Sequence, residues 1–311
     1  MTLFITESEV TNILSHKKTV ELLDEGMKAL GSGKAFNMPR KRLPVGYGGG
    51  AMNFMAASWP EKGVAGHKSY VVSQGKATFV VLLYSTEGEG LLAVIEANML
   101  GQIRTGAASA LASKYLANSN SKSLTIVGSG FQAESQLLSI ASIFDLENIN
   151  VYSRSEDKRN LFASKMSKEV NIEIKPHKNI KNAVEGSDIV CLITNSSTPV
   201  LPSQMITNGM HINAAGGNNW LRSEISSDSI GKFDLISCDN LEQAKYESKA
   251  LMEATEKGII SWNNVNELGS LIYENKKRES KNHITLYESL GIAIQDLSVA
   301  KFIYDQISAT K

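Results

Sequence analysis

The residues with the clearest chemical meaning are two closely spaced glycines that follow a short, mostly apolar run. Residues 124–127 are apolar enough for a buried parallel strand, and they lead into Gly128-Ser129-Gly130-Phe131-Gln132-Ala133. This spacing fits the G-x-G-x-x-G/A fingerprint of dinucleotide-binding folds. The first glycine permits a tight turn, the second lets the backbone approach a pyrophosphate, and the alanine lets the next helix pack closely. Because a helix N-terminus also presents free N–H groups to phosphates, residues 128–132 predict a phosphate site for NAD or NADP.

The end of the second strand of this half indicates which of the two nucleotides is bound. A cofactor with a free 2′-hydroxyl usually meets an Asp or Glu about 20 residues past the glycines. Here the strand at 149–152 is followed by Ser153-Arg154-Ser155 instead. A guanidinium flanked by hydroxyls suits a 2′-phosphate, so Ser153 and Arg154 favour NADP. Glu156 and Asp157 lie slightly further along and keep NAD open.

Strand-like and helix-like stretches alternate from residue 123 onward. This alternation predicts an α/β fold with a doubly wound parallel sheet of the Rossmann type. The expected strands are 124–127, 149–152, 172–174, 188–194, 211–215 and 233–237, and helices are expected from 131, over 156–169 and near 179–184. Because ligands bind at the carboxyl ends of such strands, Thr194, Asn195 and Ser196 are expected to line the nicotinamide ribose.

The first 119 residues have a different character. Thr6 to Glu9 is typical of a capping box, and apolar spacing over 10–14 and 20–30 predicts two helices. Short strands with glycine-containing turns then predict a small mixed or mainly antiparallel sheet. The expected strands are 40–45, 51–56, 68–72, 78–84 and 90–95, with a turn over 46–50. A helix rich in small residues is expected over 103–115, and residues 286–307 predict an amphipathic helix at the end of the chain.

The bulk composition bears on partners and compartment. The 311 residues carry 32 Lys and Arg against 32 Asp and Glu, which argues against nucleic acid or an anionic membrane as a partner. No apolar run reaches about 18 residues, so no membrane span is expected. Cys191 and Cys238 show no pairing pattern, and no His, Cys and carboxylate cluster has metal-binding spacing. With no signal peptide visible, we expect a cytoplasmic protein with reduced thiols and no metal.

Several segments taken together resemble the ornithine cyclodeaminase/mu-crystallin family over nearly the whole chain. They are Arg40, Gly66-His-Lys68, the run from Ile103-Arg104-Thr105, the Gly128–Gly130 turn, His211 to Asn218, and Tyr287 to Asp296. The family includes ornithine and lysine cyclodeaminases, alanine dehydrogenases, ketimine, pyrroline-2-carboxylate and iminosuccinate reductases, and mu-crystallin. The resemblance therefore implies the fold and the cofactor class and leaves the substrate open.

The resemblance also implies how the parts of the chain are used. Residues 1–119 would form an α+β domain for substrate binding and dimerisation, and 120–288 the dinucleotide-binding domain. Residues 289–311 would form a C-terminal helix that returns to the first domain. The expected assembly is a homodimer joined through the sheet of the first domain. Thr105, Ser289 and Gly291 are expected beside the cofactor.

The chemistry shared by this family is hydride transfer at the α-carbon of an amino acid through an imine, which needs a cation for the carboxylate and a proton carrier. The resemblance implies that Arg104 holds the carboxylate, at the start of the small-residue helix, where the helix dipole would add attraction. Arg40 matches the second substrate arginine, and Arg42, two residues further on the same strand face, stays an alternative. Lys68 matches the catalytic lysine and would touch the substrate. Because Lys68 opens an apolar strand, we expect its side chain to be partly buried and its pKa to be lowered.

Asn218 departs from the pattern of ornithine cyclodeaminases, which carry an aspartate base here. An amide cannot accept a proton from an ammonium group at neutral pH, and cyclisation of ornithine needs a base. Reduction of a preformed imine needs only a hydride, a held carboxylate and a proton donor. We therefore expect an NAD(P)H-dependent imine reductase or amino-acid dehydrogenase acting on a small imino or amino acid, with Asn218 at a catalytic position. A cyclodeaminase that uses bound NAD, and a crystallin-like NADPH-binding protein without turnover, stay open.

Overall fold

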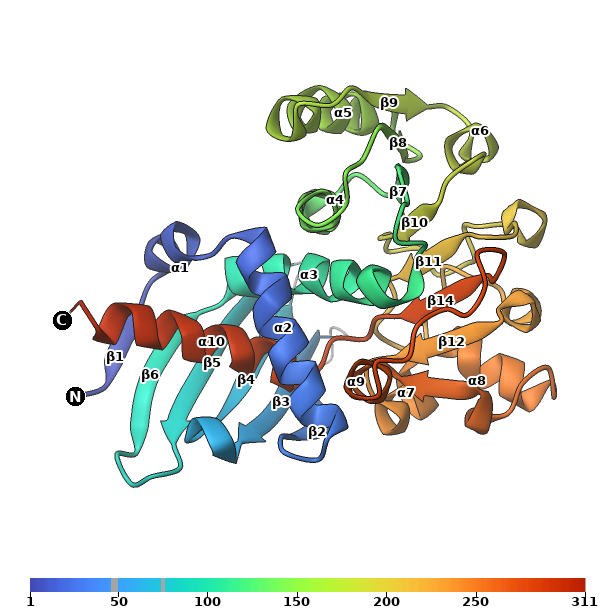
Figure 1. Ribbon diagram of the computed structural model, residues 1–311. Coiled ribbons are helices and arrows are strands. Elements are labelled where there is room, and N and C mark those ends of the chain that lie inside the picture. The colour runs from blue at the N-terminus through green and yellow to red at the C-terminus, as the bar shows by residue number, and fades with distance from the viewer. Residues whose placement is uncertain (46–49, 74–75, 311) are drawn as a thin grey trace.

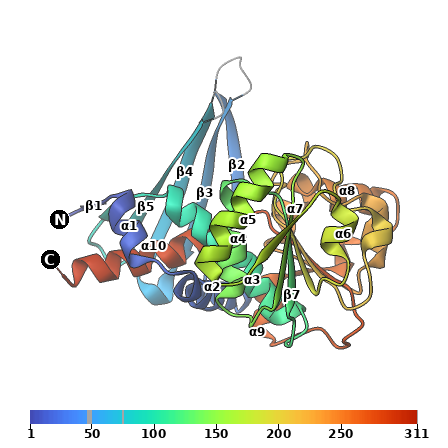
Figure 2. The same cartoon turned by 90° about the horizontal axis from the view of Figure 1, so that it is seen from above.

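Two sheets connected by a long helix form the protein. The computed structural model describes residues 1–45, 50–73 and 76–310 (Figure 1). A six-stranded sheet has the order β1-β6-β5-β4-β3-β2, and an eight-stranded sheet has the order β13-β12-β14-β11-β10-β7-β8-β9. Helix α3 (Asn98–Leu116) lies between the two sheets (Figures 1 and 2). One apolar core runs from the first sheet through α3 to β7 and β8, so a continuous packed interior joins the two halves.

The six-stranded sheet is mixed, as predicted. Its strands are β1 (Leu3–Ile5), β2 (Phe36–Val45), β3 (Gly50–Trp59), β4 (Val64–Ser73), β5 (Lys76–Ser85) and β6 (Leu91–Glu96). Neighbouring strands are antiparallel except for β1, which pairs parallel with β6. Strand β4 begins four residues before the expected start, so Lys68 lies in mid-strand rather than opening it. Of the turn expected over 46–50, residues 46–49 lie outside the described residues.

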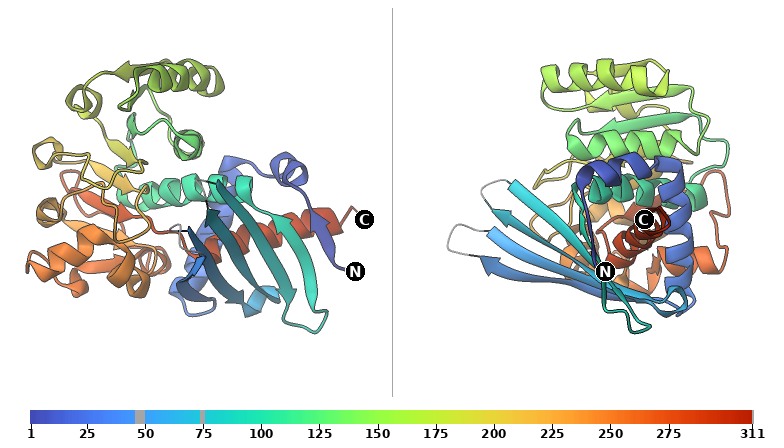
Figure 3. Two further views of the ribbon diagram at one scale, coloured as in Figure 1. Left: turned by 180° about the vertical axis from the view of Figure 1, so that it is seen from behind. Right: turned by 90° about the vertical axis from the view of Figure 1, so that its left-hand side faces the viewer.

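Helices cover one face of this sheet. The helices of this half are α1 (Glu7–Ile13), α2 (His16–Gly31), α3 and the C-terminal α10 (Ala293–Ser308). Helix α10 crosses the sheet, packing on α2, β3 and β4. Seen from behind, the strands lie in front and no described helix crosses them (Figure 3, left). The predicted capping box is present, since Thr6 N donates to Glu9 at 2.9 Å and Glu9 N donates to Thr6 Oγ1 at 3.4 Å.

The predicted start of the small-residue helix was wrong. Helix α3 begins at Asn98, so Arg104 lies in its second turn and is 7% exposed, away from the N–H groups that carry the helix dipole. The N-cap, Ala97, has no capping side chain. Instead the Glu7 carboxylate of α1 accepts hydrogen bonds from Asn98 N at 2.5 Å and Met99 N at 3.1 Å. A cap supplied from 91 residues away leaves no local signal for the helix start.

The eight-stranded sheet is entirely parallel and confirms the doubly wound fold. Its strands are β7 (Ser123–Val127), β8 (Asn148–Tyr152), β9 (Ile174–His177), β10 (Ile189–Leu192), β11 (His211–Ala214), β12 (Leu235–Cys238), β13 (Val265–Glu267) and β14 (Thr285–Glu288). Its helices are α4 (Phe131–Ala141), α5 (Glu156–Val170), α6 (Ile180–Val184), α7 (Leu241–Glu247), α8 (Lys249–Glu256) and α9 (Leu268–Tyr273).

Two expectations for this half need correction. The third strand covers 174–177 rather than 172–174. Residues 286–307 are not one helix, because residues 285–288 form β14, which is buried between β11 and β12. Only after this strand does the chain leave the sheet and form α10.

The strand order places a crevice beside β7. The chain runs from β7 outward to β8 and β9 and then returns to β10 on the other side of β7. In parallel sheets, ligands bind outside the carboxyl ends of the strands where the order reverses in this way. The segments that follow β7 and β10 therefore line the crevice, and they face the six-stranded sheet across it.

Candidate active site

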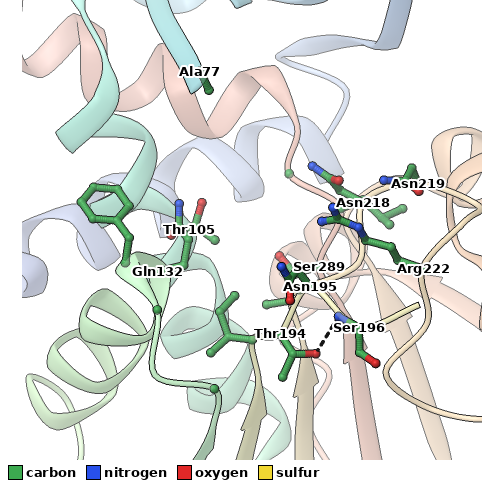
Figure 4. Close-up of a pocket in the computed structure, with 18 of the residues that line it drawn as sticks. Ala77, Thr105, Gln132, Thr194, Asn195, Ser196, Asn218, Asn219, Arg222 and Ser289 are labelled. Carbon is green, nitrogen blue, oxygen red and sulfur yellow. Dashed lines mark hydrogen bonds between the residues drawn. The ribbon is translucent and has the colours of Figure 1, made fainter. Parts of the chain in front are cut away.

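A single cavity of about 1730 Å³ lies between the two halves. All the residues predicted to act on substrate or cofactor line it, together with Arg42: Arg40, Lys68, Arg104, Thr105, Gly128, Ser129, Gly130, Phe131, Gln132, Ser153, Arg154, Thr194, Asn195, Ser196, Asn218, Ser289 and Gly291. Figure 4 labels seven of them: Thr105, Gln132, Thr194, Asn195, Ser196, Asn218 and Ser289. The substrate-binding and nucleotide-binding candidates thus share one space. Their individual roles stay predictions.

The glycine turn has the geometry that a dinucleotide needs. Gly128 has φ of 126°, a left-handed value that favours glycine, and its N–H donates to Tyr152 O at 2.8 Å. A Cβ at Gly130 would meet no protein atom within 4 Å, so it would project into the cavity where a pyrophosphate would lie. Helix α4 starts at Phe131 without a side-chain cap, which leaves its first N–H groups available to phosphate oxygens.

The far end of the nucleotide half is exposed and cationic. Ser129 Oγ donates to Ser153 Oγ at 2.8 Å, which links the glycine turn to the end of β8. Arg154 and Lys158 line the cavity, are exposed and have no ion-pair partner among the described residues. The Glu156 carboxylate instead pairs with Arg159 at 3.4 Å and with Lys178 at 3.6 Å. Among the described residues that line this end, none is Asp or Glu.

Two loops at the carboxyl edge form the middle of the cavity. In the segment after β10, Ser196 N donates to Thr194 Oγ1 at 3.2 Å (Figure 4, dashed line). The turn after β14 is held by Asp239, whose Oδ2 accepts from Leu290 N at 2.6 Å and Gly291 N at 2.7 Å. Asp239 was not predicted as a site residue, because it contacts the turn from 51 residues away.

Lys68 and Arg104 share one buried counter-ion, Asp296. Lys68 Nζ donates to Asp296 Oδ1 at 2.6 Å, and Arg104 Nε donates to the same oxygen at 3.0 Å. All three side chains are at most 8% exposed. Asp296 lies in the first turn of α10, and no role was predicted for it from the sequence. The local signal for Asp296 was weak: a carboxylate in the first turn of an otherwise apolar helix is ordinarily a dipole partner.

Burial and the neighbouring charges set the acid–base behaviour of the lysine. Burial, and then the charge of Arg104, lower the pKa of Lys68 to about 7, although Asp296 opposes them. Burial alone would raise the pKa of Asp296, but the charges of Arg104 and Lys68 hold it below its ordinary value. Lys68 can therefore gain or lose a proton near neutrality while Asp296 stays ionised. The lysine is buried more completely than the sequence predicted.

Arg40 and Arg42 both pair with Glu247, at the end of α7. Arg40 Nη1 lies 2.7 Å from Glu247 Oε2, and Arg42 Nη2 lies 2.8 Å from Oε1. Arg40 Nη2 also donates to Leu290 O at 2.7 Å and Gly291 O at 2.9 Å. The choice between the two arginines stays open, since both line the cavity and both are engaged by the protein.

The hydrogen bonds leave fewer free donors on Arg40 than on Arg104. Both terminal nitrogens of Arg40 donate to protein oxygens. Arg104 donates through Nε and Nη1, and its Nη2 has no protein acceptor among the described residues. Arg104 Nη2 and the remaining protons of Lys68 are therefore the donors best able to take a carboxylate.

Asn218 lies on the loop after β11. Its carbonyl oxygen accepts from Arg42 Nη2 at 2.6 Å and from Arg40 Nη1 at 3.4 Å, while its side-chain amide has no protein partner among the described residues. Figure 4 shows it beside Asn219 and Arg222. No Asp or Glu is among the described residues that line the whole cavity.

Comparison with known proteins gives the family. Residues 1–311 match the ornithine cyclodeaminase/mu-crystallin family. The chain belongs to this family. Delta(1)-pyrroline-2-carboxylate reductase of Bacillus cereus is 34% identical over 75% of this chain and 72% of the relative. Alanine dehydrogenase of Archaeoglobus fulgidus is 30% identical over 98% of this chain and 94% of the relative.

A solved structure of another family member resembles the whole protein. It is Thermococcus litoralis Delta(1)-pyrroline-2-carboxylate reductase in complex with NADH and L-proline. The two chains are 29% identical with a TM-score of 0.94, over 99% of this chain and 98% of that chain. The doubly wound fold and the family predicted from the sequence are thereby confirmed.

Three further features of the described residues concern metal ions, membrane spans and cysteines. Among the described residues, no group of three or more His, Cys, Asp and Glu side chains is arranged to hold a metal ion. No described helix combines the length and apolar character needed to span a bilayer. Cys191 and Cys238 are free and buried, and burial raises the pKa of Cys191 to about 12, so this thiol is not a nucleophile near neutrality.

Proposed function

We propose that this protein is an NAD(P)H-dependent imine reductase that acts at the α-carbon of a small imino acid, or catalyses the reverse oxidation of the amino acid. One observation carries the proposal: Lys68 and Arg104, sharing Asp296, line the same cavity as the Gly128–Gly130 turn. The relatives named pyrroline-2-carboxylate reductase and alanine dehydrogenase support this class of reaction.

Each group in the cavity would have its own role in the reaction. A nicotinamide bound beside Thr194 and Ser289 would supply the hydride for the imine carbon. Arg104 would hold the substrate carboxylate, since a guanidinium matches its charge and planar geometry. Lys68, with a pKa of about 7, would give its proton to the imine nitrogen. Asp296 would fix the positions of both cations, and the surrounding burial would keep bulk water away from Lys68.

We further propose NADP as the preferred cofactor, with NAD as the alternative. Arg154 and Lys158, at the cavity end beside β8 where the adenosine would lie, have no ion-pair partner among the described residues, and Glu156 pairs with Arg159 and Lys178. An unpaired guanidinium beside Ser153 favours a 2′-phosphate. The NADH in the Thermococcus litoralis complex keeps NAD open for this chain.

The assembly and organisation are also proposals. We propose a homodimer that buries the helix-free face of the six-stranded sheet, where Phe36 is 58% and Met38 41% exposed. Residues 1–119 would bind substrate and form the dimer, 120–288 would bind the nucleotide, and 289–311 would return to the first domain. A cytoplasmic location fits the two unpaired buried cysteines.

The test is a panel of imino acids with NADH and NADPH. Pyrroline-2-carboxylate, piperideine-2-carboxylate, and pyruvate, glyoxylate or oxaloacetate with ammonia or methylamine are supplied in turn. The proposal expects cofactor oxidation with at least one of them. Ammonia release from ornithine or lysine without net cofactor change would make the protein a cyclodeaminase instead. Tight NADPH binding without oxidation across the panel would make it a binding protein.

A further inference from the structure

Glu224 is a buried carboxylate behind the cavity that no part of the proposed reaction uses. It is 3% exposed and does not line the cavity. Its Oε1 accepts a hydrogen bond from Thr194 N at 2.6 Å, and its Oε2 accepts from Gly216 N at 2.7 Å. One side chain thus binds the backbone just past β10 and the backbone just past β11.

The main chain of Glu224 extends the same connection. Its carbonyl oxygen accepts from Val200 N at 2.9 Å, at the far end of the segment that begins with Thr194. A Cβ at Gly216 would lie 2.1 Å from Thr194 O and 2.7 Å from Glu224 Oε1, so these three groups pack in contact. Both ends of residues 194–200 are therefore attached to a single residue.

We infer that Glu224 is a positioning residue for the nicotinamide half of the site, acting through the backbone of the 194–200 and 216–218 loops. Two N–H groups facing one carboxylate make strong, charge-assisted hydrogen bonds. These bonds fix the relative placement of Thr194, Asn195 and Asn218, which line the cavity from two separate loops (Figure 4). The inference rests on the proposed function, because it supposes that these loops face a nicotinamide.

The chain offers a matched control at the opposite edge of the same sheet. Asp188 Oδ2 accepts from Lys122 N at 2.7 Å and from Ser123 N at 3.0 Å, at the start of β7. This carboxylate also bridges backbone N–H groups, but at the amino edge, and it does not line the cavity. Asp188→Asn therefore removes the negative charge from the same kind of backbone bridge without touching the cofactor-facing loops.

The experiment compares Glu224→Gln with Asp188→Asn at about pH 8, above the pKa of about 7 that burial gives Glu224. An amide turned toward two N–H donors can accept only one of them properly. We expect the Kd of NADPH and of NADH, and the KM for the cofactor, to rise about tenfold in Glu224→Gln and to stay unchanged in Asp188→Asn.

Two results would overturn the inference. One is an unchanged cofactor Kd and KM in Glu224→Gln, and the other is an equal rise in both variants, which would mean a general loss of stability. Should Glu224→Gln not fold, hydrogen exchange of the wild-type protein without cofactor decides: protected amides at Thr194 and Gly216 support the inference, and fast exchange contradicts it. A wild-type protein that binds cofactor but reduces no imine would refute the proposed function alone.

Discussion

The two ends of the cavity are both cationic, but they handle their charges differently. At one end, beside β4 and α10, Lys68 and Arg104 are buried and share Asp296. At the other end, beside β8, Arg154 and Lys158 are exposed and have no ion-pair partner in the described part of the chain. The first arrangement removes charges from water and compensates them within the protein, and the second leaves them solvated.

This difference suits the two ends to different tasks. Desolvation disfavours the protonated form of a lysine, so burial moves the pKa of Lys68 to about 7, where proton transfer is useful. The interaction of an exposed arginine with a phosphate contributes a modest, salt-dependent free energy of binding, which suits recognition rather than proton transfer. We therefore expect changes at the buried end to alter turnover and its pH dependence, and changes at the exposed end to alter cofactor choice.

The largest expected effect comes from Lys68→Met, which keeps the length of the side chain and removes the proton. Turnover of the imine that the wild type reduces should fall about 10²- to 10⁴-fold, the usual contribution of a general acid. The Kd of NADPH, measured by fluorescence titration, should stay within about twofold of the wild type. Ser69→Ala, on the other face of the same strand, is the control. Turnover at the wild-type level in Lys68→Met would remove the lysine from the mechanism.

The second change, Asp296→Asn, removes the shared counter-ion. Lys68 must be protonated to donate, so wild-type kcat/KM for imine reduction should fall as the pH rises through about 7. Asp296 raises the pKa of Lys68, so the loss of Asp296 should lower that pKa further. The fall of kcat/KM with rising pH should then occur at lower pH than in the wild type. Breaking a buried pair should also cost about 3–5 kcal/mol of the free energy of unfolding.

The control for Asp296→Asn lies on the same helix. Asp305 pairs with Lys301 at 2.6 Å at the surface, and such pairs contribute about 0–1 kcal/mol. Asp305→Asn should leave both the pH profile and the denaturant midpoint nearly unchanged. If kcat/KM of Asp296→Asn fell at the same pH as that of the wild type, Lys68 would not be the group that titrates.

The contrast between the two ends also explains what the sequence could reveal. The Gly128–Gly130 turn and the Arg154 loop are local patterns, because each acts through its own backbone or as an unpaired side chain. The partner of Lys68 is different: Asp296 lies 228 residues away, and only the packing of α10 on β4 brings them together. Glu224 and Glu247 went unpredicted for the same reason, since a buried carboxylate is recognised by its contacts.

Distant contacts also limited the prediction of the fold. The doubly wound sheet followed from alternating strand and helix patterns, which are local. The start of α3 did not, because Glu7 caps it from a distant helix. The helix predicted over 286–307 includes strand β14, because its four buried residues run closely into the apolar pattern of α10. In each case tertiary contacts decided what the local pattern left ambiguous.

The smallest expected effect belongs to the exposed end. Arg154→Ala removes the unpaired guanidinium beside Ser153 and should raise the Kd of NADPH about tenfold, while the Kd of NADH stays unchanged because it has no 2′-phosphate. Raising the ionic strength should weaken NADPH binding by the wild type more than by the variant. Lys168→Ala removes one positive charge from the last turn of α5, outside the cavity lining, and should leave both constants unchanged. An equal loss of NADH and NADPH binding in Arg154→Ala would mean that the arginine contacts the part common to both nucleotides, and NADP would lose its main support.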